Sequence, residues 1–296
     1  MHTITPRLIL TWFLKDIWKI LIISVFFATV SIFFALSLPN VYSSKAKVSS
    51  NLSDSKGMSG ALSGLGGLAS LAGVSIGGGG LSPEVLKEML SSSSFLASFI
   101  KKYHIEKEII AVKSFDPTTN QFGYDEKIYS TVNGEWVRDF KFPQTLEPSG
   151  AELVEKFKQS FSVQYDRKTK LITMSFSSMS PAFSQQTLEN LVFHFNDYMK
   201  NKDVSDSLLS VKYLNEQLAV AKFKEVELAI QQIMEEQYKK LALAQTREEY
   251  ALRYIESPML AVKKSGPKRA IICLAITMLG SFFSVFLWWS IRILRS

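Results

Sequence analysis

The 296-residue sequence contains one cysteine and three histidines. Because Cys273 has no partner for an internal disulfide, the chain is compatible with an oxidising compartment without depending on one. His2, His104 and His194 lie far apart in the sequence and share no metal-ligand spacing with a cysteine or a carboxylate pair. The sequence therefore predicts no metal site.

Motifs of nucleophilic catalysis are also missing. No Gly-x-Ser-x-Gly elbow occurs, although a triad built from residues distant in the sequence leaves no such signature. The adjacent glutamates at 235–236 and 248–249 fall in a helical region, where neighbouring side chains point away from each other, so they are solvated charge. His194, between Phe193 and Phe195 on a helix, is typical of a packed or a surface imidazole and not of a catalytic base. We expect a chain that is not an enzyme.

Charged residues are absent from residues 20–44 and again from residues 270–291. The apolar run 20–38 has 19 residues, about 28 Å of helix, against a bilayer core of about 30 Å. It is too long for the apolar part of a signal peptide and lacks a small-x-small cleavage pattern. The second run carries Trp288 and Trp289 where an aromatic belt meets the headgroups. We predict two transmembrane helices, 20–38 and 270–291.

A loop of 231 residues, 39–269, separates the two predicted spans and is long enough for a folded domain. The tails, 1–19 and 292–296, are short, so we expect no kinase or other output domain and place the function in the loop. Residues 1–38 and 270–296 carry +2 each of the net charge of +7, which leaves +3 on the loop. This balance argues against a nucleic-acid partner. Positive residues flank both sides of each span, so charge counting does not fix the orientation.

The first part of the loop, 39–181, predicts an α/β base. Residues 41–48 read as a strand, 82–100 as two short helices, and 149–160 as a helix with a Ser149 and Glu152 capping box. The runs 161–165 and 171–176 predict a hairpin, and 115–148 predicts loops with short strands.

A glycine-rich segment, 57–80, interrupts this base. Ten of its 24 residues are glycine, without a fixed period, which predicts a mobile loop. Gly64, Gly66 and Ala69 approximate a dinucleotide fingerprint, but no strong strand precedes them and no Gly-Lys-Ser/Thr follows. We expect no nucleotide and no other cofactor.

Neither glycine nor proline occurs in residues 182–257, which are rich in Glu, Gln, Lys, Leu and Ala. This composition and the apolar spacing of three and four predict a long helical segment, 182–248. Unbroken through Leu243 it would reach about 90 Å, and folded back near 221–226 about half of that. Either length exceeds what the domain can bury, which favours a homo-oligomer. An exposed helix held by its own side-chain pairs is the alternative.

The two ends of the loop resemble those of the bacterial polysaccharide chain-length determinants, also called polysaccharide co-polymerases. The resemblance rests on the exit segment 38–44 (LPNVYSS), the closing segment 249–258 (EYALRYIESP) and the approach 265–270 (SGPKRA), and its order of parts covers the whole chain. The approach to the second span has fewer prolines than members of the family often have. The membrane-proximal residues that match the motif are Pro39, Tyr42, Ser43, Pro258, Pro267, Lys268 and Arg269.

The resemblance implies an α+β inner-membrane protein with both termini cytoplasmic and a periplasmic α/β base that carries an extended helical hairpin. It implies a ring of identical chains, a return strand at 250–255 and, without a kinase domain, the type that works on O-antigen or a related glycan. The implied order is tail 1–19, span 20–38, base 39–181, helical segment 182–248, return segment 249–269, span 270–291 and tail 292–296.

The implied function is control of surface polysaccharide chain length by a homo-oligomeric scaffold. Its implied partners are other copies of the chain, a separate polymerase in the inner membrane and the growing glycan. Within the second span, Gly280 and Ser284 form a small-xxx-small pair that favours packing against another helix. A periplasmic adaptor of an envelope export complex is the alternative function, and a glycan ligase comes third.

Overall fold

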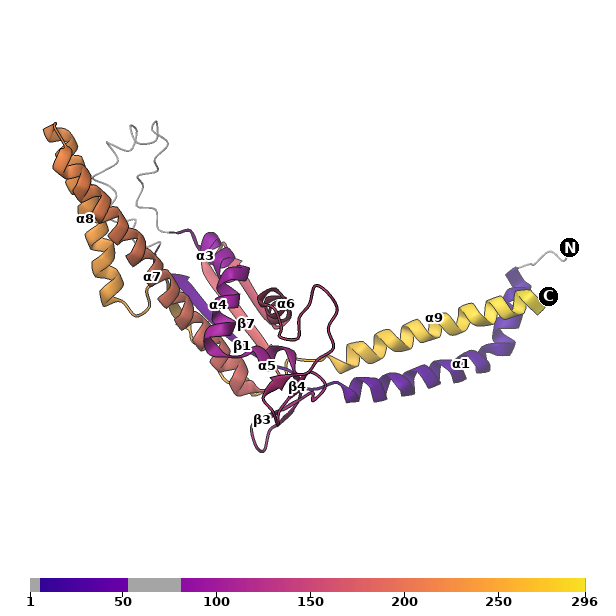
Figure 1. Ribbon diagram of the computed structural model, residues 1–296. Helices are drawn as coiled ribbons and strands as arrows, with labels where there is room; N and C mark the ends of the chain where they lie inside the picture. Colours follow the sequence, from indigo (N-terminus) through magenta and orange to yellow (C-terminus); the bar gives the residue numbers. More distant parts are fainter. Residues whose placement is uncertain (1–5, 53–80, 296) are drawn as a thin grey trace. The chain divides into compact units, whose positions relative to one another are not determined.

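The computed structural model describes residues 6–52 and 81–295. The chain divides into two compact units, one formed by Met1–Val41 with Lys263–Ser296 and the other by Tyr42–Val262. The predicted mobile loop at 57–80 lies outside the described residues, as does the dinucleotide-like motif within it. We describe each unit by itself (Figure 1).

The first unit is a pair of long helices, α1 (Pro6–Ser37) and α9 (Arg269–Arg295). Helix α1 begins well before the predicted span, with proline at its first position, where the missing N–H costs nothing. Within the described residues one stretch, Arg269–Phe286, is long and apolar enough to cross a bilayer, with a mean hydropathy of 1.9. The apolar part of α1, Leu21–Ser37, is shorter. The first predicted transmembrane helix is thus a helix in the structure, but its crossing of a membrane stays a prediction.

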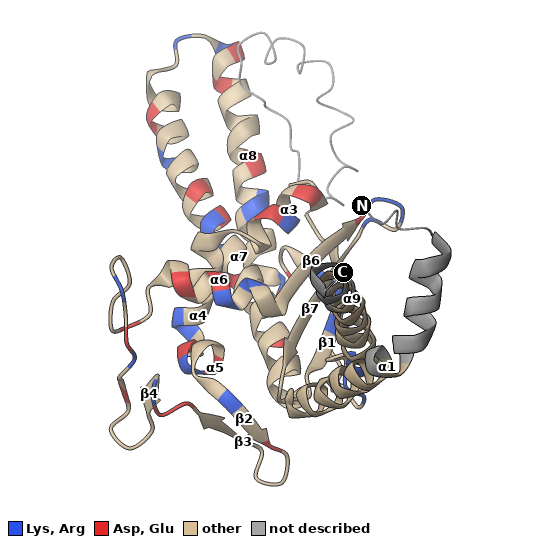
Figure 2. Ribbon diagram, turned by 90° about the vertical axis from the view of Figure 1, so that its right-hand side faces the viewer, with Lys and Arg blue, Asp and Glu red and all other residues tan. Residues whose placement is uncertain are grey.

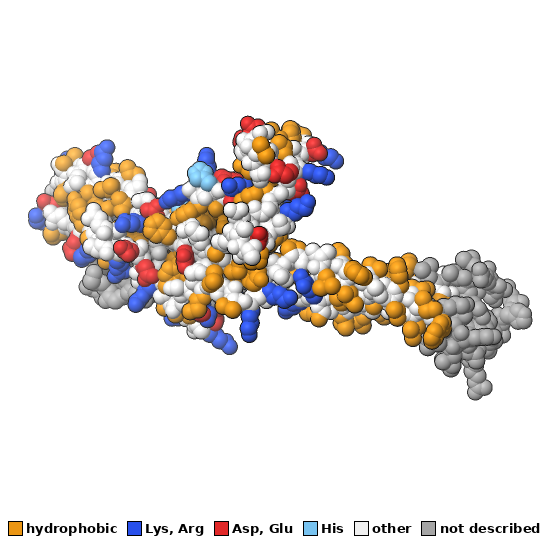
Figure 3. Space-filling model, turned by 90° about the horizontal axis from the view of Figure 1, so that it is seen from below, with side chains coloured by type: hydrophobic (Ala, Val, Ile, Leu, Met, Phe, Trp, Pro, Cys, Tyr) orange, Lys and Arg blue, Asp and Glu red, His pale blue; other side chains and the backbone are white. Residues whose placement is uncertain are grey.

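The side chains of this helix pair are apolar on the outside as well as the inside. Figure 3 shows hydrophobic side chains over the described part of the face that the helix pair presents in this view. Phe33 on α1 and Phe282 on α9 are more than 70% exposed. Single exposed apolar residues are common, but a surface covered by them is typical of contact with lipid or with another protein.

The second unit is built on a four-stranded antiparallel sheet in the order β6-β7-β1-β8. Along β1 the buried residues Ala46 and Val48 alternate with the exposed residues Lys45 and Lys47, as a strand with one buried face requires. Ala46 lies opposite Met174 of β7. The predicted strands are all present, with the bounds β1 Tyr42–Ser50, β6 Phe161–Asp166, β7 Leu171–Ser178 and β8 Leu252–Glu256.

Short helices with serine caps pack against the sheet and against one another. The side chains of Ser82, Ser92 and Ser149 each accept a backbone N–H of the first turn. These caps confirm the predicted helix starts at Ser82 and Ser149. The serine-capped helices are α3 Pro83–Leu90, α4 Ser93–Tyr103 and α6 Gly150–Ser160, and the short helix α5 Glu106–Ile110 begins after Ile105 without a side-chain cap.

Residues 112–148 form two small hairpins and a connecting loop, as predicted. Strands β2 and β3 pair around Asp116, and β4 and β5 pair Tyr129 with Trp136. The loop that follows returns to α6. The strands are β2 Val112–Asp116, β3 Gln121–Tyr124, β4 Tyr129–Ser130 and β5 Glu135–Trp136.

The long helical segment folds back on itself. Helix α7 (Pro181–Val220) ends before Ala221, and α8 (Lys224–Thr246) runs back beside it (Figure 2). The shorter of the two predicted arrangements is therefore present. The first half of α7 contributes Leu188, Phe195 and other residues to the core, whereas the far half of the hairpin is mostly exposed.

The core of the second unit lies between the sheet, α7 and the short helices. Its centre is aromatic: Phe99 and Phe157 have ring centroids 5.8 Å apart, and Phe157 stacks on Phe176 at 5.1 Å. Asn196 of α7 is also buried, and its side chain bonds to the backbone of Ala251 and Leu252. This amide therefore joins α7 to the last strand of the sheet.

Candidate functional site

The two ends of the loop meet in backbone hydrogen bonds. In the first unit, the N–H of Val41 donates to the carbonyl oxygen of Gly266 at 2.9 Å, and the N–H of Ser265 donates to the carbonyl oxygen of Val41 at 2.8 Å. The exit segment and the approach segment of the sequence motif are thus adjacent in space. Sequence reasoning placed both at the membrane without predicting that they pair.

Arg269 connects the start of α9 to the end of α1. Its guanidinium donates to the carbonyl oxygen of Leu38 at 2.9 Å and to Oδ1 of Asn40 at 3.2 Å. The last carbonyls of a helix lack intrahelical partners and carry partial negative charge, so a cation there stabilises the helix end. Of the other motif residues in this unit, Pro39 and Lys268 are exposed and Pro267 is half-buried.

The remaining motif residues belong to the second unit. Tyr42 begins β1, and its carbonyl oxygen accepts the hydroxyl of Ser184 on α7 at 3.0 Å. Ser43 lies opposite Ser177 of β7 in the sheet register. Pro258 follows β8 and is buried. These three residues anchor the first and last strands of the sheet.

The predicted small residues of the second span lie on the face of α9 that packs against α1. Gly280 and Ser284 are both buried. A Cβ added at Gly280 would lie 2.6 Å from Cβ of Phe27 on α1, closer than real Cβ atoms approach other atoms. Thr277, one turn before Gly280, lies 3.5 Å from Ser31 across the pair. The glycine thus permits a close approach of the two helices of one chain.

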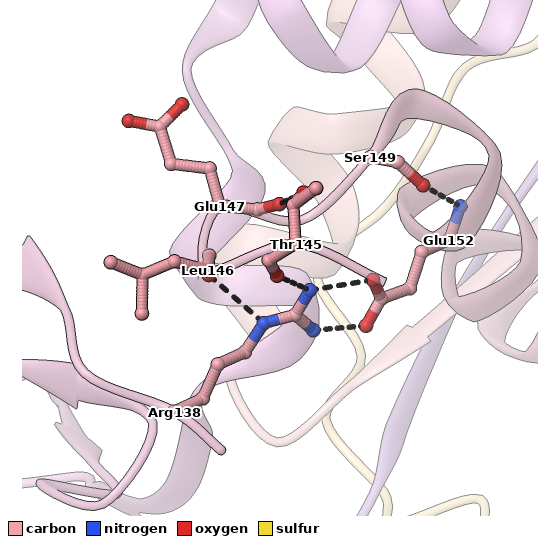
Figure 4. Close-up of polar contacts among 6 residues, drawn as sticks. All are labelled: Arg138, Thr145, Leu146, Glu147, Ser149 and Glu152. Atoms are coloured by element: carbon pink, nitrogen blue, oxygen red, sulfur yellow. Dashed lines mark hydrogen bonds and ion pairs between the residues drawn. The ribbon is translucent and has the colours of Figure 1, made fainter. Parts of the chain in front are cut away.

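An ion pair that sequence reasoning missed fixes the loop between β5 and α6. Arg138 binds Glu152 through both carboxylate oxygens, with one N–O distance of 2.8 Å, and it also donates to the carbonyl oxygens of Thr145 and Leu146 (Figure 4). The Arg138 side chain is only 9% exposed. The paired guanidinium holds the pKa of Glu152 below its usual value, and Glu152 holds the pKa of Arg138 above its usual value.

This ion pair corrects the predicted capping box. Ser149 does cap α6, accepting the N–H of Glu152 at 3.3 Å, but the Glu152 carboxylate binds Arg138 in place of the Ser149 backbone. A charged partner with several donors binds a carboxylate more strongly than a single amide does. Because Arg138 lies 14 residues away on an irregular loop, no local pattern signals the pair.

The described residues contain no group of three or more His, Cys, Asp or Glu side chains placed to hold a metal ion. His194 is buried, which is the packed one of the two arrangements that its position between two phenylalanines left open. His104 lies at the end of α4, outside the core cluster.

No family model matches this sequence, and neither does any curated protein. Among solved structures, the chain is similar to one described as a full-length bacterial polysaccharide co-polymerase, with 12% identity, a TM-score of 0.39 and coverage of 97% of both chains. It is also similar to a fragment of WzzB, a polysaccharide co-polymerase from Salmonella Typhimurium, with 12% identity, a TM-score of 0.34 and coverage of 77% of this chain and 100% of that chain. Both structures bear the name of the family that the end motifs of this sequence resemble.

Proposed function

We propose that this chain regulates the length of a surface polysaccharide, O-antigen or a related lipopolysaccharide glycan, as a homo-oligomeric scaffold in the bacterial inner membrane. The proposal places both termini in the cytoplasm and residues 39–269 in the periplasm. It assigns the bond-making step to a separate polymerase and gives this chain the regulation of when elongation stops.

One observation carries the proposal: the two ends of the loop are hydrogen-bonded to each other. Val41 pairs with Gly266 in the first unit and β1 pairs with β8 in the second, so the beginning and the end of the loop are joined by hydrogen bonds within each unit. A domain fixed at both ends in this way suits a stationary scaffold, which positions another protein and needs no catalytic side chain.

The helical hairpin supports self-association. Its outer half exposes large apolar side chains that its own chain leaves uncovered, among them Leu209 at 65%, Val220 at 68% and Phe223 at 70%. Apolar residues spread along a hairpin favour contact with a partner of matching length. Other copies of the same chain provide that surface, and a ring of such copies presents the polymerase with a fixed number of equivalent sites.

The mechanism that we propose is kinetic. A polymerase held by the scaffold elongates the glycan at one rate and releases it at another, and the ratio of the two rates sets the preferred length. The scaffold changes this ratio without contributing a reacting group.

Electrophoresis of surface glycan from a deletion strain tests the function. We expect the ladder to lose its preferred length while polymer is still made, and re-expression of the chain to restore it. An unchanged ladder, or a defect in small-molecule efflux instead, contradicts the proposal and favours the export adaptor. Bonds formed when purified chain meets labelled lipid-linked repeat units would instead reveal a ligase.

A further inference from the structure

Four elements of the second unit surround a hollow of about 700 Å³. The end of α4, the start of α5, the β4–β5 hairpin and the start of α6 each contribute to its wall. Ligand pockets in proteins have volumes of about 300 to 1,000 Å³. The hollow is therefore large enough for an organic ligand of several ring units, and neither the end motifs nor the long helices account for it.

One wall is aromatic. Tyr129 and Trp136 lie opposite each other on the β4–β5 hairpin, and their ring centroids are 5.2 Å apart at an interplanar angle of 71°. Neither residue is part of the core cluster, and both remain partly accessible. Two aromatic rings held at an angle offer apolar faces to a flat apolar surface, such as the C–H face of a pyranose ring.

The polar groups of the hollow carry both signs of charge. Lys101 and His104 come from the end of α4, Glu106 from α5 and Glu147 from the loop before α6. The side chains of these four residues form no hydrogen bond or ion pair with any residue in the described part of the chain. In Figure 4 the Glu147 carboxylate points away from the Arg138 and Glu152 pair.

This mixture selects for a class of ligand. A site that binds phosphate is lined by hydrogen-bond donors and positive charge, and a site that binds an ammonium group is lined by carboxylates. Here Lys101 and Lys107 balance Glu106 and Glu147. Hydroxyl groups both donate and accept, so a neutral, polyhydroxylated ligand satisfies ammonium and carboxylate groups together.

His104 occupies a backbone conformation that favours glycine. It ends α4 with φ of 51° and ψ of 45°, the left-handed region, where glycine is the usual residue. A histidine in this conformation costs a small amount of conformational free energy relative to glycine. Unlike glycine, it places an imidazole in the wall of the hollow.

The Arg138 and Glu152 ion pair holds the hollow in shape. Arg138 follows Trp136 by two residues, and its bonds to Thr145 and Leu146 fix the loop that ends in Glu147. Its partner Glu152 lies on α6 between two other wall residues, Gly150 and Leu153. A wall fixed before the ligand arrives lowers the ordering cost of binding.

We propose that this hollow binds a short neutral segment of glycan, with its C–H faces against Tyr129 and Trp136 and its hydroxyls on Lys101, His104, Glu106 and Glu147. The identification of the ligand as the growing surface polysaccharide rests on the proposed function, which this inference deepens. Such a site lets the scaffold hold the polysaccharide whose length it regulates, because a bound segment delays release of the glycan.

Isothermal titration of the full-length protein in detergent tests the site. The probe is the oligosaccharide mixture released by mild acid from the surface polysaccharide of a strain that expresses the gene. We expect binding to the unaltered chain and at least a tenfold loss of affinity in Trp136→Ala, because the variant removes an aromatic face.

Two variants separate binding from folding. His104→Gly removes the imidazole and relieves the left-handed backbone, so we expect unchanged or higher thermal stability together with weaker binding. The control is Phe142→Ala, which changes an aromatic residue of the loop between β5 and α6. Phe142 is 97% exposed and lies outside the hollow, so we expect this variant to bind as the unaltered chain does. Equal affinity in all three variants, or no binding to the unaltered chain, overturns the site.

The glycan ladder distinguishes a failure here from a failure of the proposed function. A deletion strain with an altered ladder, combined with unaltered binding in Trp136→Ala and His104→Gly, supports the function and overturns the hollow. An unchanged ladder in the deletion strain, combined with selective loss of binding in both variants, supports a saccharide site and overturns the role in chain length.

Discussion

The hydroxyl of Ser98 donates to the carbonyl oxygen of Phe95 at 2.7 Å, and its oxygen lies 3.2 Å from Nε2 of His194. Nδ1 of His194 is buried and has no hydrogen-bond partner in the described part of the chain. In the protonated imidazole both ring nitrogens are donors, so Nδ1 would then be a buried N–H group of a charged ring without a partner.

Burial and, next, Lys102 lower the pKa of His194, and Asp197 opposes them. A histidine whose pKa is lower in the folded state favours folding when it is neutral, so its contribution is present above the unfolded pKa of about 6.5 and is lost as the pH falls. We expect thermal unfolding of the full chain in detergent to shift to lower temperature as the pH falls from 7 to 5.

His194→Gln is expected to reduce this pH dependence. The matched control is His104→Asn, which changes a histidine outside the core and is expected to leave the dependence unchanged. An identical slope in His194→Gln and the unaltered chain would show that the imidazole is not responsible.

Asn196 contributes three hydrogen bonds from one side chain. Its Oδ1 accepts the backbone N–H groups of Ala251 at 2.8 Å and Leu252 at 2.7 Å, and its Nδ2 donates to the carbonyl oxygen of Leu252 at 3.0 Å. All of these groups are buried. Strand β8 starts at Leu252, two residues after the start predicted from the sequence, residue 250.

Asn196→Ala is expected to lower the free energy of unfolding by about 3 kcal/mol, since each buried backbone group left without a partner costs about 1–3 kcal/mol. Chemical denaturation of the purified chain measures the change. Asn201→Ala, on the exposed side of the same helix, is the control and is expected to change stability by less than about 0.5 kcal/mol.

At the scale of elements, the sequence predicted those that rest on local patterns. Serine before Pro83 and Gly150 marked two helix starts, and alternation marked β6 and β7. The order β6-β7-β1-β8 was not predictable, because β1 pairs with strands more than 100 residues away and no local signal selects those partners. The break at 221–223 has no glycine or proline, so the choice of a hairpin depends on contacts between α7 and α8.

In the candidate site, too, residues with a signal in the sequence were predicted, and features formed by distant segments were not. The motif residues 39 and 267–269 were predicted from the resemblance, and the structure adds the hydrogen-bonded partners of Arg269, which are Leu38 and Asn40. The hollow was not predicted, because its walls come from four elements that are distant in sequence and meet only in the folded chain. A backbone conformation such as that of His104 is likewise invisible in a single sequence.

The pairing of α1 with α9 depends on one glycine. We expect Gly280→Leu to separate the helices, because a side chain at this position would overlap Phe27. In cells, the expected result is a broader polymer length distribution with a similar total amount of polymer, measured by electrophoresis.

The double variant Gly280→Leu with Phe27→Ala tests whether the contact is the cause. Removing the ring makes room for the new side chain, so a narrower distribution than in the single variant is expected. If Gly280→Leu alone leaves the ladder unchanged, the contact has no part in length control.

At the scale of the whole molecule, the apolar surfaces of the hairpin and of the helix pair are the parts that one chain leaves uncovered. Their side chains include Phe223 at the end of the hairpin and Phe33 on α1, both at least 70% exposed. The apolar composition of the helix pair favours contact with lipid. The hairpin, in contrast, also carries many charged residues along its length (Figure 2). A mixed surface of this kind is typical of contact between proteins.

We expect the full chain in lipid nanodiscs to have the mass of several copies. Phe223→Asp and Val220→Asp are expected to lower that mass, because they place charge in an apolar contact. Native mass spectrometry measures the outcome, and Lys222→Asp, at an already charged position, is the control. A single copy in both gentle detergent and nanodiscs contradicts the scaffold.

Because β1 lies beside β8 and α1 lies beside α9, the first and last thirds of the polypeptide hold each other without help from the turn at 221–223. A protease that nicks this turn would leave two pieces that stay together, and two half-genes split there would express pieces that find each other.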